Sequence, residues 1–377
     1  MDDISGVKLL DGTPDPFEPS QQSGLAAAYY GFTGMYHIFD HHSKAVPRIS
    51  FANADPSLLC CASLDNTLSL CRLHPSPKVI HVMKGPKAGI TDIQWSLSDD
   101  RILSCSLDGS LWLWNAEEGS LLRAMPFPIP DTPLLACRFH SLNNNYIAVG
   151  SAAGHVQTLN ISTGTPAPKD PLAHIGHECP VLSLCVEPQG TLLWAGDAQG
   201  NLTSFRFDGV TGALEKLRQV SVALNRSVSS VNYKAWFWKG RQDPCLLVNV
   251  SCDALCLFRV CSSSGEVMLR RKFQVFHTQG YLRSTFSPSV TSRNHGVPVV
   301  SGSEDGAVYF FDAEGQSSSP FNVLQGHSRS VLDVSFSADE SFLASADADG
   351  VVIVWNRQPR QEPLPSDEDD EPALEYP

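Results

Sequence analysis

The residues best able to do chemistry lie near the end of the sequence. His327, Ser345 and Asp349 occur in one short stretch, and these are the three residue types of a common hydrolase active site. In such a site the serine attacks the substrate, the histidine takes its proton and the aspartate orients the imidazole. A second cluster, Asp40-His41-His42, has residue types that bind metal ions. Whether either cluster is a site depends on the elements that position its side chains.

Composition limits the classes of function. The chain has 377 residues, 42% of them hydrophobic and 18% charged, so it holds enough apolar material for a large folded domain. The net charge of −13 argues against broad binding to nucleic acids, which needs clustered lysine and arginine. The eleven cysteines include no Cys-x-x-Cys pair, which favours buried thiols in a reducing compartment over a zinc site. No apolar run is long enough to predict a membrane span.

The sequence repeats itself every 43 to 54 residues. Each copy contains runs of alternating apolar and polar residues on either side of a tight turn, as in "SADADGVVIVW" and "SLDGSLWLW". The turn position recurs at Asp65, Asp108, Ala153, Gln199, Asp253, Asp305 and Asp349. Alternation predicts strands, and Asp-Gly between two strands predicts a hairpin.

Each repeat has room for four strands, so the seven repeats predict an all-β fold, a seven-bladed β-propeller. The propeller is expected over residues 34–357. Residues 1–33 and the acidic tail 358–377 are expected to be disordered, because they are polar and rich in proline or acidic residues. The alternating segment Tyr36–Asp40 is expected to pair beside "VVIVW" and so to complete the last blade.

These repeats resemble the WD-repeat family. The residues that match the family pattern in the last and the second repeats are Gly326, His327, Asp333, Asp349 and Trp355, and Asp92, Asp108 and Trp114. The resemblance implies that His327, Ser345, Asp349 and Trp355 form a hydrogen-bonded chain that braces the last blade. It also implies a seven-bladed WD-repeat β-propeller that acts as a non-enzymatic scaffold for protein interactions.

The residues themselves also favour a structural role over catalysis. Fragments of the same set recur at the repeat period, as Ser104 with Asp108 and Ser301 with Asp305, whereas a catalytic set is unique in a chain. In the cluster Asp40-His41-His42, neighbouring residues on a strand point to opposite faces, which argues against a metal site. We therefore predict no catalytic residues, no metal and no cofactor.

Inserted segments in the fifth and sixth repeats are the predicted partner-binding surface. The long intervals place "KAWFWKGRQDP" and "SPSVTSRNHG" between the first and second strands of these repeats, on one rim of the propeller. Aromatic and basic residues are favoured at protein interfaces, and the candidates here are Trp236, Phe237, Trp238, Lys239, Arg241 and Arg293. An alternative for Trp236 is that it packs inside the blade. Arg329, in a loop on the opposite side, is a second candidate.

The tail and the family resemblance supply further predictions. Ser366 precedes a run of acidic residues, which is typical of a substrate of an acid-directed kinase, and the alternative is a solubilising tail. Stretches such as "GMYHIFD" and "LLWAGD" resemble one vertebrate member of the family whose N-terminal extension is longer and more basic. This resemblance implies transcriptional or chromatin regulators as partners and a location in the nucleus, with the cytoplasm as a further location. No direct nucleic-acid or membrane partner is predicted.

Two alternative functions stay open at the level of sequence. One is a direct reader of modified histone or other peptides through the channel face, which would require aromatic residues around the channel mouth. The other is a propeller enzyme, which would require a cluster of carboxylates or histidines that faces the channel from several blades.

Overall fold

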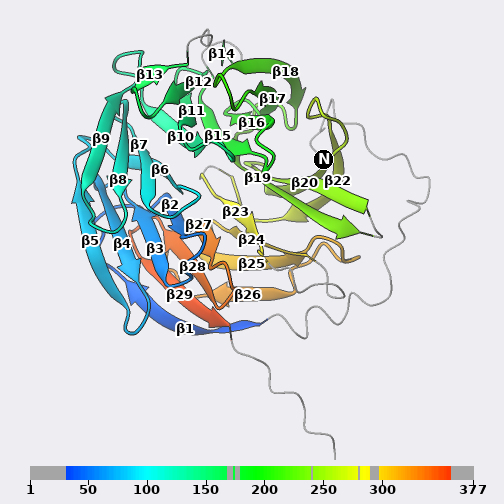
Figure 1. Ribbon diagram of the computed structural model, residues 1–377. Helices are drawn as coiled ribbons and strands as arrows, with labels where there is room; N and C mark the ends of the chain where they lie inside the picture. The colour runs from blue at the N-terminus through cyan, green and yellow to red at the C-terminus, as the bar shows by residue number, and fades with distance from the viewer. Residues whose placement is uncertain are drawn as a thin grey trace, which may run out of the picture.

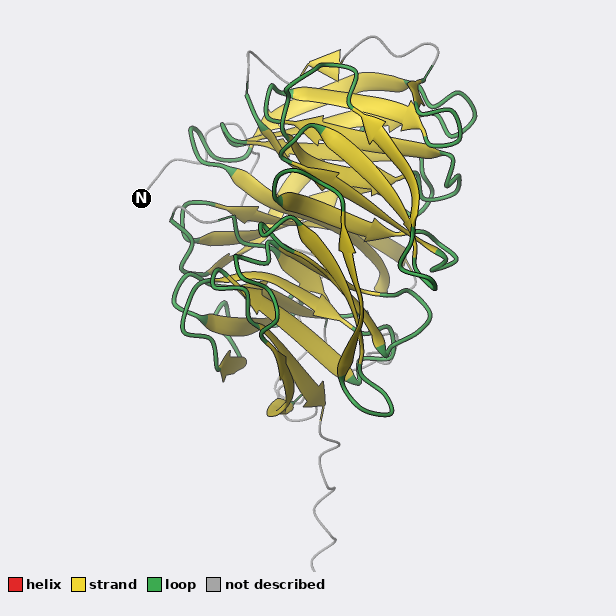
Figure 2. Ribbon diagram, turned by 90° about the vertical axis from the view of Figure 1, so that its left-hand side faces the viewer, coloured by secondary structure: helices red, strands yellow, loops and turns green. Residues whose placement is uncertain are grey.

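The computed structural model describes residues 31–167, 173–174, 179–238, 241–278, 281–288 and 297–357. Within this part of the chain every regular element is a β-strand, and the strands form seven sheets arranged in a ring (Figures 1 and 2). The described residues form no helix, and hence none that could cross a membrane. The fold is an all-β, seven-bladed β-propeller, as predicted from the repeats.

The first four blades follow the order of the chain, and each is an antiparallel sheet. Blade 1 consists of β2 (Arg48–Phe51), β3 (Leu58–Ala62), β4 (Thr67–Arg72) and β5 (Lys78–Lys84). Blade 2 consists of β6 (Ile90–Trp95), β7 (Arg101–Ser106), β8 (Ser110–Asn115) and β9 (Leu121–Pro126). Blade 3 consists of β10 (Leu134–Phe139), β11 (Tyr146–Ser151), β12 (His155–Asn160), β13 (Thr165–Pro166) and β14 (Ala173–His174). Blade 4 consists of β15 (Val181–Val186), β16 (Leu192–Asp197), β17 (Asn201–Phe207) and β18 (Leu214–Ser221).

The last three blades complete the ring. Blade 5 consists of β19 (Val228–Trp238), β20 (Arg241–Val250), β21 (Ala254–Val260) and β22 (Val267–Gln274). Blade 6 consists of β23 (Ser284–Phe286), β24 (Pro298–Gly302), β25 (Ala307–Asp312) and β26 (Asn322–Gln325). Blade 7 consists of β27 (Val331–Phe336), β28 (Phe342–Asp347), β29 (Val352–Arg357) and, from the other end of the chain, β1 (Phe32–Phe39).

The repeated alternation explains how the blades pack. β6 "ITDIQW" and β27 "VLDVSF" share one pattern of buried and part-buried residues, because both are first strands of a repeat. The first strands are innermost, and those of consecutive blades contact one another around the ring (Figure 1). The hydrophobic core lies between neighbouring blades. In one cluster, Leu70 of blade 1 packs with Trp95 and Trp114 of blade 2.

The tight turns between the second and third strands explain the Asp-Gly signal. Gly350 has a φ of 97°, and a Cβ atom there would lie 2.6 Å from the carbonyl oxygen of His42 in blade 1. Blade 1 has Asn66 at the equivalent place, with a φ of 72°, and asparagine adopts this left-handed conformation more readily than most residues. The turn of each blade therefore packs closely against the segment that enters the next blade.

The ring is closed by the N-terminal strand. β1 pairs antiparallel with β29, with Met35 opposite Trp355 and Phe39 opposite Val352, which confirms the predicted closure. The predicted boundary at residue 34 is wrong, however, because β1 begins at Phe32. This side chain is buried and stacks on Phe310 of blade 6, with ring centroids 6.0 Å apart, so the residue belongs to the propeller.

The two faces of the ring carry different loops. We call the side with the loops between first and second strands the lower face, and the side with the loops between second and third strands the upper face. The insertion in blade 5 lies on the lower face as predicted, but its loop is shorter than expected. β19 and β20 continue through most of it, with Trp236 opposite Asp243 and Trp238 opposite Arg241.

Candidate interaction sites

The histidine and serine of the apparent triad form a buried structural chain in blade 7. His327 Nδ1 lies 2.8 Å from Asp347 Oδ2, and its Nε2 lies 2.7 Å from Ser345 Oγ. The indole N–H of Trp355 donates to the same Ser345 Oγ at 2.8 Å. Because the serine is fully buried and both of its contacts lie within the blade, no substrate can reach its hydroxyl. These three residues brace the blade, as the resemblance implied.

The predicted fourth member of this hydrogen-bonded chain, Asp349, is wrong. The carboxylate that contacts His327 belongs to Asp347, which is buried at the end of β28. Its Oδ1 also accepts the backbone N–H groups of Asp349 and Val351, and so it shapes the turn. Asp349 lies outside this chain and instead forms an exposed ion pair with Arg329, 3.2 Å between Oδ2 and Nε.

Blade 1 contains a different version of the same brace. His42 lies 3.0 Å from Asp65 Oδ2 through Nδ1 and 2.8 Å from Ser69 Oγ through Nε2. Burial is the largest effect on the pKa of both His41 and His42 and lowers it, for His41 to about 4. His42 is thus engaged within the protein, and no cluster suited to a metal ion occurs among the described residues.

Trp236, the first candidate of the blade 5 insertion, packs between blades. Its indole N–H donates to Glu314 Oε1 of blade 6 at 2.7 Å, and its ring meets Phe286 edge-on with centroids 5.9 Å apart. The guanidinium of Arg270 lies over the ring at 5.8 Å. These contacts support the alternative that Trp236 joins two blades rather than anchoring a partner.

Most of the other predicted site residues lie partly or wholly outside the described structure. The backbones of Phe237, Trp238 and Arg241 lie in β19 and β20, but their side chains are outside the described part of the structure. Lys239, Arg293 and Ser366 also lie outside the described residues. Arg329 is exposed on the upper face, as predicted, and is paired there with Asp349.

A ring of equivalent positions surrounds the central channel. Each blade contributes one residue that faces the same place on its second strand, from the first strand itself or, in blade 6, from the residue just before it. These residues are Arg48, Asp92, Ala136, Ser183, Ser230, Arg283 and Asp333. Going from blade 6 through blades 7 and 1 to blade 2, these residues alternate in charge. Blades 3 to 5 contribute small, uncharged residues. We call this set the channel ring.

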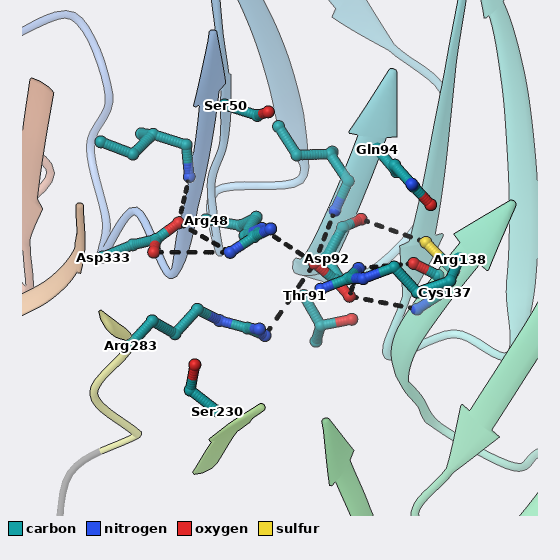
Figure 3. Close-up of polar contacts among 12 residues, drawn as sticks. Arg48, Ser50, Thr91, Asp92, Gln94, Cys137, Arg138, Ser230, Arg283 and Asp333 are labelled. Atoms are coloured by element: carbon teal, nitrogen blue, oxygen red, sulfur yellow. Dashed lines mark hydrogen bonds and ion pairs between the residues drawn. The ribbon is translucent and has the colours of Figure 1, made fainter. Parts of the chain in front are cut away.

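The charged half of the channel ring is a buried ion-pair network (Figure 3). Arg48 lies between two carboxylates, with Nη1 3.4 Å from Asp333 Oδ2 and Nε 3.2 Å from Asp92 Oδ1. Arg138, two residues beyond the ring position of blade 3, reaches Asp92 Oδ2 at 2.6 Å. Each aspartate also accepts a backbone N–H from the next blade, Ile49 at 2.8 Å for Asp333 and Cys137 at 3.1 Å for Asp92. The network therefore fastens blades 7, 1, 2 and 3 together.

The two carboxylates of the channel ring differ in their electrostatic surroundings. Burial would raise the pKa of Asp92, but the guanidinium groups of Arg138, Arg283 and Arg48 outweigh burial, and its pKa is lowered. For Asp333 burial is the larger effect, and its pKa is raised despite Arg48 and Arg283. The positive charge of the network is therefore concentrated around Asp92.

A cavity of about 430 Å³ lies at the mouth of the channel on the lower face. It is lined by Asn53, Gln94, Trp95, Leu97, Phe139, His140, Ser141, Leu142, Asn144, Val186, Pro188 and Tyr233. Two of these side chains are largely exposed at its rim, Leu97 (61%) and Leu142 (68%). We call this the lower-face cavity.

Hydrogen bonds between loops fix the walls of the lower-face cavity. Asp99 accepts the backbone N–H groups of Asn53 and Ala54 at 2.9 and 2.7 Å, which ties blade 2 to blade 1. Ser141 Oγ donates to the carbonyl oxygen of Glu187 at 2.6 Å, which ties blade 3 to blade 4. The cavity is thus held in shape before any partner arrives.

The lower-face cavity is uncharged at neutral pH. None of the described residues that line it is Asp, Glu, Lys or Arg. Burial lowers the pKa of His140, whose Nδ1 accepts the backbone N–H groups of Leu142 and Asn143, so the imidazole is neutral. The side-chain oxygen of Asn144 has no hydrogen-bond partner among the described residues. Such a site suits an apolar side chain on a polypeptide whose N–H groups need acceptors.

Sequence reasoning missed both the channel ring and the lower-face cavity. A usable signal existed, because residues at one position of successive repeats must meet around the channel. Arg48, Asp92 and Asp333 stand at that position in three consecutive blades, and Leu97 and Leu142 follow the first strands of blades 2 and 3. Inserted segments point to unusual loops and not to positions that all repeats share.

Two segments of the chain match a known protein family. Residues 77–115 and 318–356 match the family described as WD domain, G-beta repeat. Each match runs from the outer strand of one blade to the third strand of the next, β5 to β8 and β26 to β29. Two segments of the seven-bladed propeller therefore match the WD-repeat family model, in agreement with the family resemblance seen in the sequence.

The chain is similar, at low identity, to several curated proteins. It is 23% identical over 338 residues to the WD repeat-containing protein WDS homolog of Arabidopsis thaliana. The aligned region covers 86% of this chain and 57% of that protein. It is 23% identical over 296 residues to Jouberin of Rattus norvegicus, covering 75% of this chain and 26% of Jouberin. A probable cytosolic Fe-S cluster assembly factor of Schizosaccharomyces japonicus is 27% identical over 86 residues, 22% of this chain and 14% of that protein. The chain thus spans between about a quarter and somewhat over half of the first two relatives.

Proposed function

We propose that this protein is a non-enzymatic scaffold that holds a segment of a partner protein in the lower-face cavity. The observation that carries the proposal is an uncharged, preformed cavity of about 430 Å³ with Leu97 and Leu142 exposed at its rim. Exposed apolar side chains beside a concave site mark contact surfaces, and burying them on binding is favourable by about 25 cal/mol per Å² of apolar area. The partner segment therefore presents an apolar side chain.

The composition of the cavity favours such a segment over a modified histone tail. Recognition of a methylated lysine needs exposed aromatic faces that surround a cation. Trp95 and Phe139 are buried in the wall, which leaves Tyr233 as the one part-exposed aromatic ring of the lining. The direct reading of modified peptides is therefore the weaker proposal.

The channel ring also argues against an enzyme that uses its carboxylates. Asp92 and Asp333 are each held by arginine and by a backbone N–H group, so neither is available as a base or nucleophile. Propellers of the WD-repeat family generally act as interaction platforms, and this supports the same conclusion.

The cellular context of the proposal rests on resemblance alone. The stretches "GMYHIFD" and "LLWAGD" resemble those of WD repeat-containing protein 13 of vertebrates. From this likeness we infer a location in the nucleus and partners among transcriptional or chromatin regulators. Phosphorylation of Ser366 in the acidic tail would add further negative charge for a basic partner.

A quantitative capture experiment tests the scaffold proposal. The full chain, the variant Leu97→Asp/Leu142→Asp and the control Val82→Asp/Leu121→Asp are compared as baits in nuclear and cytoplasmic extracts. Val82 and Leu121 are about half exposed on the outer strands of blades 1 and 2, so the control adds the same charges outside the cavity. We expect a defined set of partners to be lost with the first variant and kept with the control. Equal partner sets for all three baits would contradict the proposal.

A further inference from the structure

One guanidinium of the channel is buried without a close partner. Arg283 is 6% exposed, yet its nearest carboxylate oxygen, Asp92 Oδ1, is 3.9 Å from Nη2, which is beyond hydrogen-bonding distance. Among the described residues its side chain makes no hydrogen bond. Buried guanidinium groups are otherwise paired and hydrogen-bonded, because an uncompensated buried charge is costly. The environment of Arg283 is therefore incomplete.

The charges of the channel do not balance. Among the described residues, the carboxylates that form ion pairs with Arg48, Arg138 and Arg283 are those of Asp92 and Asp333 (Figure 3). Three positive charges against two negative charges leave one positive charge in the buried network. The chain as a whole carries −13, so this excess is local and is not part of a generally basic surface.

The channel ring has small residues next to the guanidinium of Arg283. Blade 5, which precedes Arg283 in the ring, contributes Ser230, and blades 4 and 3 contribute Ser183 and Ala136. Ser230 Oγ accepts a hydrogen bond from Asn232 Nδ2 at 3.0 Å, so its own proton is available to donate. Figure 3 draws Ser230 below Arg283, and its strand β19 contacts β23, which follows Arg283 directly.

We propose that the channel binds a single small oxyanion, with Arg283 as the main ligand and Ser230 as a second donor. A phosphate or sulfate group offers several acceptor oxygens to the planar guanidinium and would neutralise the excess charge. Arg138 supports the site from the other side, since it and Arg283 lie within 4 Å of the same carboxylate. The oxyanion is either a free inorganic ion or a phosphate group on a peptide that enters the channel. This site is separate from the lower-face cavity and does not depend on the proposed function.

The test measures binding of two probes to the full chain by isothermal titration calorimetry. One probe is inorganic phosphate with chloride as the reference at equal ionic strength, and the other is a phosphoserine peptide with its unphosphorylated form as the reference. Three proteins are compared: the wild type, Arg283→Gln and the control Arg206→Gln. Arg206 is exposed and paired with Glu215, far from the channel.

We expect phosphate to bind the wild type and Arg206→Gln alike, and Arg283→Gln to bind it at least about tenfold more weakly, as for the loss of a charge-assisted hydrogen bond. Binding of the phosphopeptide alone, with the same loss in Arg283→Gln, would support the site and assign the oxyanion to a peptide. Thermal melts in chloride give a second readout, since Arg283→Gln should be no less stable than the wild type there and should lack the stabilisation by phosphate. If Arg283→Gln does not fold, Ser230→Ala takes its place with a smaller expected loss. No preference for phosphate with either probe, or equal binding by the variant, would overturn the proposal.

Discussion

His327 and Asp347 face each other at 2.8 Å inside blade 7, while the carboxylate of Asp349, two residues further along, lies at the surface beside Arg329. Asp347 serves the imidazole with one oxygen and the backbone of the turn with the other. The blade is therefore held by a carboxylate that comes from the end of a strand and not from the tip of the turn. This relationship separates two aspartates that look alike in the sequence.

The first prediction compares these two aspartates. Asp347→Ala leaves two backbone N–H groups and His327 without their acceptor, so we expect a loss of about 3 kcal/mol in the free energy of unfolding. Asp349→Ala removes only an exposed ion pair, and the expected loss is below about 0.5 kcal/mol. Urea unfolding followed by tryptophan fluorescence measures both. Equal losses would show that the brace has been assigned to the wrong residue.

The limit of sequence reasoning is clear at this site. "SADADG" offers two aspartates, and strand alternation does not decide which of them reaches the histidine, because both point to the same side. In blade 1 the outcome differs, since His42 contacts Asp65, the residue equivalent to Asp349, and Ser63 stands where Asp347 would be. The repeat period predicted the blades, the closing strand and the residue types of the brace. The partner of each histidine depends on side-chain packing, which the period does not contain.

Side-chain packing also explains why the sequence did not predict the lower-face cavity. The inserted aromatic residues were predicted to bind a partner, but the indole N–H of Trp236 donates to Glu314 of the next blade. The lower-face cavity is assembled from single residues of several repeats, and none of them is unusual by itself. The packing of blade 2 against blade 3 brings Leu97 and Leu142 to one rim, so contacts between repeats rather than a local pattern create the site.

A second prediction concerns Trp236. Trp236→Phe keeps most of the ring packing but removes the hydrogen bond to Glu314, so we expect about 1 kcal/mol of destabilisation and no change in the partners captured from extract. Trp238→Ala/Arg241→Ala tests whether the tip of the same hairpin binds partners, as predicted from the sequence. Loss of partners with Trp236→Phe, at full stability, would return this residue to the binding surface.

A third prediction uses Lys234, the part-buried lysine of blade 5. Burial lowers the pKa of Lys234 from 10.5 to about 8, and Glu340 offsets only part of this effect. The unfolded chain therefore binds more protons than the folded one between pH 8 and 10.5, so the penalty is complete below pH 8 and is relieved as the pH rises. Relative to Lys234→Met, the wild type should gain on the order of 3 kcal/mol of stability across that window. A difference that stays constant from pH 7.5 to 10.5 would contradict the lowered pKa.

A fourth prediction tests the closure of the ring. Phe32 is buried against Phe310 and Phe336, with ring centroids 6.0 and 5.9 Å away, and Phe32→Ala should cost roughly 3–5 kcal/mol of stability. Met35 lies on the same strand but is 46% exposed, so Met35→Ala should cost less than about 1 kcal/mol. Thermal and urea unfolding of both variants provide the comparison. Similar small losses would mean that β1 contributes little to the closure.

The most direct test of the central claim is site-specific photo-crosslinking in cells. A photoreactive amino acid replaces Leu142 at the rim of the lower-face cavity in one protein and Leu224 on the upper face in another. The two leucines are 68% and 66% exposed, so solvent access does not distinguish them. The scaffold proposal predicts a discrete crosslinked partner from position 142 that disappears with Leu97→Asp, and none from position 224. The same partner from both positions, or a partner from 224 alone, would contradict the proposal that the lower-face cavity is the binding site.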